Sequence, residues 1–196
     1  MDPRARARLY TFLSRLFVKE VDDAFAEVLR GEQGRALLPA FTRSADADAL
    51  FPEARRVATF DADFAHVTVV NVVPYESFYR RDDAMIESGG ANPLAVFLTK
   101  YGFEAELGTV RSLSPDHLGI ELELMALLCA READAASDDE ARQARAVERE
   151  LLTDHLLAWA PLYLLAVKRS ARTELYRDGA DAVLHLLHQH HEELAA

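Results

Sequence analysis

Apolar side chains near the start of the chain recur with the period of an α-helix. They fall at i, i+3, i+4, i+7 and i+8, which is one stripe of an amphipathic helix: Leu9, Phe12, Leu13, Leu16 and Phe17. Arginines precede this stripe, as they do in signal and transit peptides. However, Arg15 interrupts the apolar stretch, and no small-residue cleavage site follows it. We therefore predict a helix of the folded protein, not a leader.

Helical patterns and helix-end signals continue to the C-terminus, without an internal repeat. Asn92-Pro93 and Ser114-Pro115 each join a capping residue to a proline suited to the first helical turn. Pro161 lies inside the long helix expected after residue 140 and should kink or break it. Further helices are expected at 23–31, 32–41 and 94–101, and from residues 52, 115, 140 and 173. These elements predict an all-α fold, a single-domain helical bundle that spans residues 1–196.

Two segments modify this picture. Residues 67–73 are rich in valine and favour a strand, but no second convincing strand exists to pair with it, so we expect the helix from residue 52 to fray into an extended loop. Residues 132–140 form an acidic, alanine-rich connector and are the best candidate for a hinge. Between them lies a helix that is apolar nearly all round, from Leu118 to Leu128, and we expect it to be central and buried.

The charge of the chain limits its partners. The net charge is −11, which disfavours nucleic acid and anionic membranes and favours a cationic partner. The longest uncharged apolar run, residues 155–167, is too short to span a bilayer. Cys129 is the single cysteine, so no internal disulfide can form, and its apolar neighbours predict a buried thiol. We expect a cytoplasmic protein without stable membrane insertion.

Motifs of enzymes are absent: there is no phosphate-binding loop, no His-Glu-x-x-His and no nucleophile elbow. We therefore expect neither an enzyme nor a cofactor. The alternative is a metal-binding helical bundle or a metal-dependent enzyme. It would use His117 and Glu121, which are one helical turn apart, and histidines of the C-terminal helix. The C-terminal histidines are His185, His188, His190 and His191. The simpler interpretation is that neither set, His117 with Glu121 or the C-terminal histidines, binds a metal and that both are ordinary polar side chains.

Three polar and aromatic segments stand out from the helical pattern. The first is Val73–Tyr79, which contains a proline and two tyrosines. The second is Ser114–Glu121, which has Pro115, Asp116 and His117 at the start of a helix. The third is His155–Tyr163, which contains Trp159. By residue physics alone, the first is a loop packed on the core or a binding surface, the second a capped helix with paired carboxylates, and the third core packing. At His117 the helix dipole and Glu121 have opposite effects on the imidazolium, so the sequence does not decide the direction of its pKa shift.

Together, in this order and spacing, the three segments resemble the TorD/DmsD/NarJ family of chaperones that mature molybdenum enzymes. The resemblance extends from about Leu9 to Leu187. It implies an all-helical cytoplasmic protein that binds the twin-arginine signal peptide, or another N-terminal segment, of a molybdopterin oxidoreductase. Such a chaperone holds its client until the cofactor is inserted and so delays export.

The resemblance also implies where the client binds. The peptide-binding region would be bordered by Pro74, Tyr75, Glu76, Ser77, Tyr79, Pro115, Asp116, His117 and Glu121. Carboxylates beside an apolar, aromatic-lined groove suit a peptide with two arginines followed by an apolar stretch. The chain would be a monomer or a domain-swapped homodimer, in which the hinge at 132–140 opens.

Overall fold

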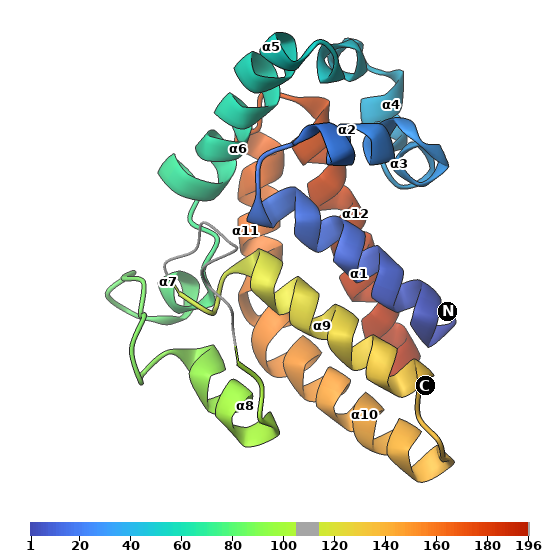
Figure 1. Cartoon of the computed structure of the whole chain (residues 1–196). Helices are drawn as coiled ribbons and strands as arrows, with labels where there is room; N and C mark the ends of the chain where they lie inside the picture. The colour runs from blue at the N-terminus through green and yellow to red at the C-terminus, as the bar shows by residue number, and fades with distance from the viewer. Residues whose placement is uncertain (105–113, 196) are drawn as a thin grey trace.

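The computed structural model describes residues 1–104 and 114–195, and its regular elements within them are helices. The long ones are α1 (Pro3–Val18), α9 (Leu118–Ala133), α10 (Asp138–Glu150), α11 (Leu157–Ser170) and α12 (Glu174–Ala195). Figure 1 shows α1 running along α9, α10 packing against α9, and α11 packing against α12. The predicted all-α bundle is confirmed. In the part of the chain described, no helix is long and apolar enough to cross a membrane.

Shorter elements occupy the stretch between α1 and α9. They are α2 (Asp23–Arg30), α3 (Glu32–Leu37), α4 (Pro39–Arg43), the 3₁₀ helix η1 (Ala45–Leu50), α5 (Glu53–Arg56), the π-helical η2 (Val57–Asp61), α6 (Ala62–Ala65), the π-helical η3 (His66–Val70), α7 (Glu76–Arg80) and α8 (Pro93–Tyr101). Figure 1 shows α2 to α5 gathered at one end of the bundle, whereas α7 lies near the start of α9.

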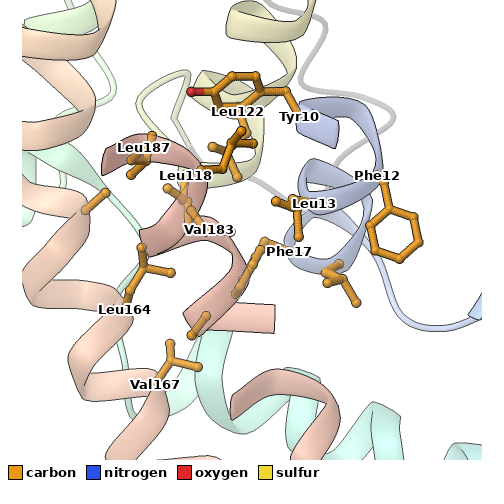
Figure 2. Close-up of a cluster of buried hydrophobic side chains, with 14 of the residues drawn as sticks. Tyr10, Phe12, Leu13, Phe17, Leu118, Leu122, Leu164, Val167, Val183 and Leu187 are labelled. Atoms are coloured by element: carbon orange, nitrogen blue, oxygen red, sulfur yellow. The ribbon is translucent and has the colours of Figure 1, made fainter. Parts of the chain in front are cut away.

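Most of the apolar stripe predicted for the first helix faces the centre of the bundle, whereas Phe12 packs against Phe25 of α2. The Asp2 carboxylate caps α1 by accepting the Ala5 N–H at 3.0 Å, and Pro3 occupies the first turn. Figure 2 shows the side chains that α1 meets there: Leu118 and Leu122 from α9, Leu164 and Val167 from α11, and Val183 and Leu187 from α12. Burial of this stripe is therefore what holds α1 in place.

Helices α1 and α9 approach each other most closely at Gly119. A Cβ atom at this position would lie 2.3 Å from Cγ1 of Val18. The Ser14 hydroxyl donates a hydrogen bond to the Gly119 carbonyl at 2.7 Å. This contact needs a residue without a side chain, and that requirement explains the glycine in the first turn of α9.

The valine-rich segment is more helical than its β-propensity predicts. The helical path that begins at Glu53 continues through η3 to Val70, and only the residues after it form the expected loop. Val67 is fully buried, and its carbonyl accepts the Tyr163 hydroxyl at 2.9 Å. Tertiary burial therefore overrides local propensity here, and the helix extends farther than predicted.

The expected break at Pro161 does not occur. Between α10 and α11 lies the π-helical segment η5 (Leu151–Leu156), and the helical path is continuous from Asp138 to Ser170. The Leu157 N–H bonds to the Leu152 carbonyl, five residues back, just before the proline. We attribute the continuity to this wider turn, which changes the hydrogen-bond register ahead of the residue that lacks an N–H.

Three expectations about α9 need correction. The helix begins at Leu118, not at Pro115, and it ends at Ala133, so only residues 134–137 connect it to α10. Glu132, which was assigned to the hinge, belongs to α9 and has a largely buried side chain. Moreover, α9 is not buried all round, because Leu127 is 57% exposed. Exchange of helices between two chains remains a prediction.

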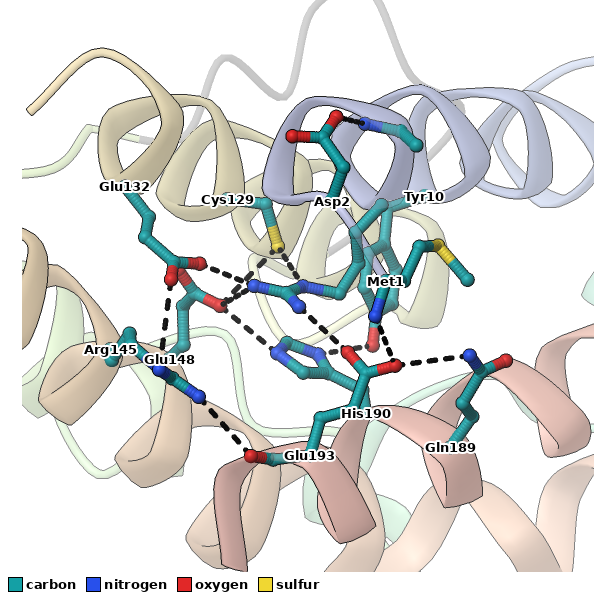
Figure 3. A network of polar contacts seen from close by, with 12 residues as sticks. Met1, Asp2, Tyr10, Cys129, Glu132, Arg145, Glu148, Gln189, His190 and Glu193 are labelled. Atoms are coloured by element: carbon teal, nitrogen blue, oxygen red, sulfur yellow. Dashed lines mark hydrogen bonds and ion pairs between the residues drawn. The ribbon is translucent and has the colours of Figure 1, made fainter. Parts of the chain in front are cut away.

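A buried ion network joins the two ends of the chain (Figure 3). Arg6 of α1 contacts carboxylates from three other helices: Glu132 of α9, Glu148 of α10 at 3.3 Å and Glu193 of α12 at 2.9 Å. The Arg6 and Glu148 side chains are buried, so each needs the opposite charge of the other. The network therefore ties α1 to α9, α10 and α12.

Glu148 also holds His190, the buried member of the C-terminal histidines. Nε2 of His190 lies 3.0 Å from the Glu148 carboxylate, and Nδ1 lies 2.9 Å from the Tyr10 hydroxyl. Burial lowers the pKa of His190 and outweighs the opposing hydrogen bond from Glu148. Cys129 is buried as predicted, and burial raises the pKa of its thiol. Both groups are thus neutral at neutral pH, which leaves Arg6 as the cation next to Glu148.

Candidate functional site

The three segments singled out in the sequence come together at the start of α9. Residues 73–76 pair with residues 116–118 in a short antiparallel contact: the Glu76 N–H donates to the Asp116 carbonyl at 3.0 Å, and the Leu118 N–H donates to the Pro74 carbonyl at 2.9 Å. Helix α7, which follows the loop, packs against α11. Segments far apart in the sequence therefore form one site.

The Asp116 carboxylate has a different role from the one predicted. It is buried, and it accepts the Ser77 N–H at 2.7 Å in the first turn of α7. Its other oxygen lies within hydrogen-bond distance of the Ser114 hydroxyl. Asp116 thus caps α7 instead of the helix that follows it in the sequence, because the chain turns between Asp116 and Leu118.

A set of polar side chains holds the segment between α7 and α8 against this turn. Asn92 donates from Nδ2 to the Ser114 hydroxyl at 2.8 Å and to the Glu87 carbonyl at 2.6 Å. The Glu87 N–H donates to the Ser77 hydroxyl at 3.0 Å. Asn92 also caps α8, as predicted, by accepting the Leu94 N–H at 2.9 Å. The loop around the site is therefore built into the fold by buried hydrogen bonds.

His117 caps α9. Its Nδ1 accepts the Gly119 N–H at 3.1 Å, and its ring meets the Tyr75 ring edge to face, with centroids 5.2 Å apart. Burial lowers the pKa of His117 to about 4, and the charge of Asp116 opposes this only in part. The neutral form is therefore present at neutral pH, with an unprotonated Nδ1 that can accept the cap. Burial, which the sequence does not reveal, decides the sign of the shift.

Two buried carboxylates lie behind this turn. Glu76 is held by Nδ1 of His155 at 2.9 Å and by Arg80. The Trp159 Nε1–H donates to the Glu121 carboxylate and lies 3.2 Å from each of its oxygens. Among the described residues, no cation forms an ion pair with Glu121, whereas Glu76 is paired with Arg80. Burial, followed by the charge of Glu76, raises the pKa of Glu121 well above its ordinary value. Glu121 is therefore harder to ionise than an exposed glutamate.

Trp159 connects these carboxylates to the aromatic loop. Its indole is fully buried, as predicted, and the Tyr79 ring stacks on it at 5.5 Å between centroids. Tyr79 itself is half-buried. The sequence correctly predicted that Trp159 lies in the core. It did not predict the hydrogen bond to Glu121, because two residues 38 positions apart share no local pattern.

Most of the residues predicted to border a peptide are not at the surface. Of the nine, Tyr79 and Pro115 are partly exposed; the buried members are Pro74, Tyr75, Glu76, Ser77, Asp116, His117 and Glu121. The structure thus brings the predicted residues together, but as the internal support of a site. Any molecule that binds here must touch their exposed neighbours.

Exposed neighbours lie on an outer face of η5 and α11, next to the buried face that carries His155 and Trp159. These are Asp154, Ala158, Leu162 and Leu165, at i, i+4, i+8 and i+11. Leu162 is 60% exposed and Leu165 49%. Val69 and Val70 of η3 are 61% and 69% exposed, and the Tyr163–Val67 hydrogen bond places η3 beside the middle of α11. The sequence reasoning missed this face, although its helical spacing could have revealed it.

The residues proposed for a metal centre are not brought together. His117 uses Nδ1 for the Gly119 N–H, and Glu121 uses both oxygens for Trp159. Of the C-terminal histidines, His185, His188 and His191 are exposed, and His190 faces Tyr10 and Glu148. This geometry does not support a site that combines the two sets.

One cluster within the described residues has the spacing of metal ligands. Cys129, Glu148 and His190 place one potential ligand atom each within 4.8 Å of the others. However, Nε of Arg6 lies 3.4 Å from the Cys129 sulfur, and its Nη2 lies 3.3 Å from Glu148. The Arg6 guanidinium already balances the charge of Glu148 and occupies the position that a metal ion would need. This cluster therefore fits an ion network better than a metal centre.

Glu121 predicts an unusual pH dependence of stability. Because its pKa is higher in the folded than in the unfolded state, its contribution to stability is fully present below the unfolded pKa and is lost as the pH rises. We expect Glu121→Gln to raise the melting temperature, and to do so more at pH 8 than at pH 5. Glu123→Gln, at an exposed position of the same helix, is the control and should change little. Equal melting temperatures of Glu121→Gln and the unaltered protein at both pH values would contradict the assignment.

Comparison with known proteins finds relatives over most of the chain. A family model described as the nitrate reductase delta subunit matches residues 19–164. The chaperone protein TorD of Salmonella bongori is 26% identical over 200 residues, which cover 94% of this chain and 87% of that protein. TorD of Aeromonas salmonicida is 29% identical over 192 residues, with 91% and 85% covered, and TorD of Vibrio vulnificus is 26% identical over 176 residues, with 81% and 80% covered.

The matched stretch contains all three segments that form the site. The relatives are named chaperones, not enzymes, in agreement with the prediction from the sequence. The chain therefore belongs to the nitrate reductase delta subunit family, the family of TorD-like chaperones for the maturation of molybdenum enzymes.

Proposed function

We propose that this protein is a cytoplasmic chaperone that binds the twin-arginine signal peptide, or another N-terminal segment, of a molybdopterin oxidoreductase. It holds the client while the molybdenum cofactor is inserted and releases it for export. The observation that carries the proposal is the meeting of the three family segments in one site, within the stretch that matches the family. We place the client over the loop at 73–79 and along the outer face of η5 and α11.

The order of side chains on that outer face suits such a peptide. Asp154 lies at one end, and Ala158, Leu162 and Leu165 follow along the helix; Val69 and Val70 of η3, the element that Tyr163 joins to α11, are exposed as well. A twin-arginine peptide carries two guanidinium groups followed by an apolar stretch. We infer that the arginines lie toward Asp154 and the apolar stretch along the leucines. The net charge of −11 adds a general attraction for a cationic segment.

The buried residues of the site then have a positioning role. Asp116 and His117 cap α7 and α9, and Glu76 joins α7 to His155 of η5. These contacts fix the loop and the outer face relative to each other. Tyr79, which with Pro115 is one of the two predicted residues that reach the surface, would contact the client, and its ring stacks on Trp159. Modest affinity is expected, because the peptide must become ordered on binding and must later be released.

Calorimetry with a synthetic signal peptide tests the proposal. The peptide is taken from a molybdopterin oxidoreductase encoded in the same genome, and a second peptide carries two lysines in place of the arginines. We expect binding that weakens as salt is added, and weaker binding of the lysine peptide. Leu162→Asp should lower the affinity about tenfold or more, since one apolar contact replaced by a charge costs on the order of 1.4 kcal/mol or above.

Val96→Asp is the matched control, because Val96 is an apolar residue that is 69% exposed and lies on α8, which is not among the elements to which the client is assigned. It should bind the peptide like the unaltered protein. The proposed site is wrong if Leu162→Asp binds normally. The proposed function is wrong if no signal peptide and no full-length oxidoreductase from that genome binds the unaltered protein.

A further inference from the structure

A second groove lies on another part of the molecule, between α1, α2 and α9. Its volume is about 670 Å³. Its lining is mostly small or apolar and includes Ala7, Phe12, Phe25, Ala126, Leu127 and Ala130. Leu127, on the outer face of α9, is 57% exposed, and Val28 on the opposite wall is 41% exposed. The groove uses none of the residues to which the client was assigned.

The rim of this groove is basic on a strongly acidic protein. Arg4, Arg8 and Arg15 of α1 line one side, and Glu123 of α9 is the acidic residue of the lining. Arg4 pairs with exposed Asp134, and Arg15 pairs with Asp22. Arg8 is exposed, and no ion pair is found for it with any described residue. Arg8 is thus the cation of the rim that remains available to a ligand, on a protein whose net charge is −11.

We propose that this groove binds an amphipathic helix of a partner protein, whose apolar stripe is flanked by acidic residues. Leucine-sized side chains of that helix would fill the depression over Ala7, Ala126 and Ala130, and its carboxylates would pair with Arg8. The arginine rim extends from Arg4 to Arg15, which is about 16 Å of α-helix, so a partner helix of about three turns matches it. A twin-arginine segment has the wrong charge for this rim, so the groove selects a different segment from the one proposed above.

Two matched peptides test the inference. Both have 14 residues with leucines on one helical stripe; one carries glutamate beside the stripe, and the other carries lysine at the same positions. Fluorescence anisotropy with the full-length protein should show at least tenfold tighter binding of the glutamate peptide. Arg8→Glu should remove that preference and favour the lysine peptide, whereas Leu127→Asp should weaken binding of the glutamate peptide at least tenfold.

The controls distinguish this groove from the proposed client site and from a contact between two copies of the chain. Val96→Asp should leave both affinities unchanged, and amide signals of the labelled protein should shift at Ala7, Leu127 and Ala130 but not in the loop at 73–79. If Arg8→Glu is poorly folded, Arg8→Gln should still give weaker binding of the glutamate peptide. Equal affinity for the two peptides, or signal shifts confined to the loop, would overturn the inference. It would also be overturned if Arg8→Glu altered the size of the protein on gel filtration without altering peptide binding, because the occupant would then be a second copy of this chain.

Discussion

Arg6→Ala is expected to lower the free energy of unfolding by about 3–5 kcal/mol, because it leaves a buried carboxylate without its cation. Glu148 is fully buried, and its partners are Arg6, His190 and the weakly donating Cys129 thiol. Since His190 is neutral, Arg6 supplies the positive charge. A loss of this size is a large part of the roughly 5–15 kcal/mol that stabilises an ordinary domain. Urea unfolding followed by circular dichroism measures it.

Arg4→Ala is the matched control for this substitution. Arg4 is two residues away on the same helix, but its pair with Asp134 is exposed on both sides. It should lose no more than about 1 kcal/mol. Adding Glu148→Gln to Arg6→Ala should recover part of the loss, because it removes the unpaired charge. If Arg6→Ala were as stable as Arg4→Ala, Arg6 would not be balancing a buried charge.

Trp159→Ala should be the second strongly destabilising substitution, with a loss of about 3–5 kcal/mol from the cavity that it leaves. The indole is fully buried, stacks on Tyr79 and donates to Glu121. The alanine variant therefore loses packing and also leaves a buried carboxylate without its donor. The same urea unfolding measurement applies. For this reason, Trp159→Ala cannot report on client binding alone.

Trp159→Phe separates the two contributions. It keeps an aromatic ring beside Tyr79 but removes the N–H, and we expect a loss of about 1–3 kcal/mol from the unsatisfied Glu121. Adding Glu121→Gln should reduce that loss, because a neutral amide is less costly to bury than a carboxylate. A Trp159→Phe protein with unchanged stability would mean that the indole N–H contributes nothing. A normally folded Trp159→Ala protein would contradict the placement of the indole in the core.

The sequence by itself determined the fold class, the approximate positions of most helices and some of their caps. The apolar stripe from Leu9 to Phe17, the Asn92-Pro93 start of α8 and its end at Gly102, where φ is +69°, all appear in the structure as expected. Each of these signals lies within a few neighbouring residues, because helical periodicity and capping are local properties of the chain. Local signals did not predict the structure where tertiary packing outweighed them. Val67 favours a strand by its β-propensity, but it is helical because it is buried.

Only the tertiary structure decided what the polar residues do. Asp116 caps a helix that begins 40 residues before it, and Arg6 meets Glu148 across 142 positions. Burial set the pKa of His117 at about 4, where the sequence left two opposing effects, and it moved the residues expected at the surface of the site into its support. Desolvation and long-range pairing depend on which helices pack together, and no local pattern carries that information.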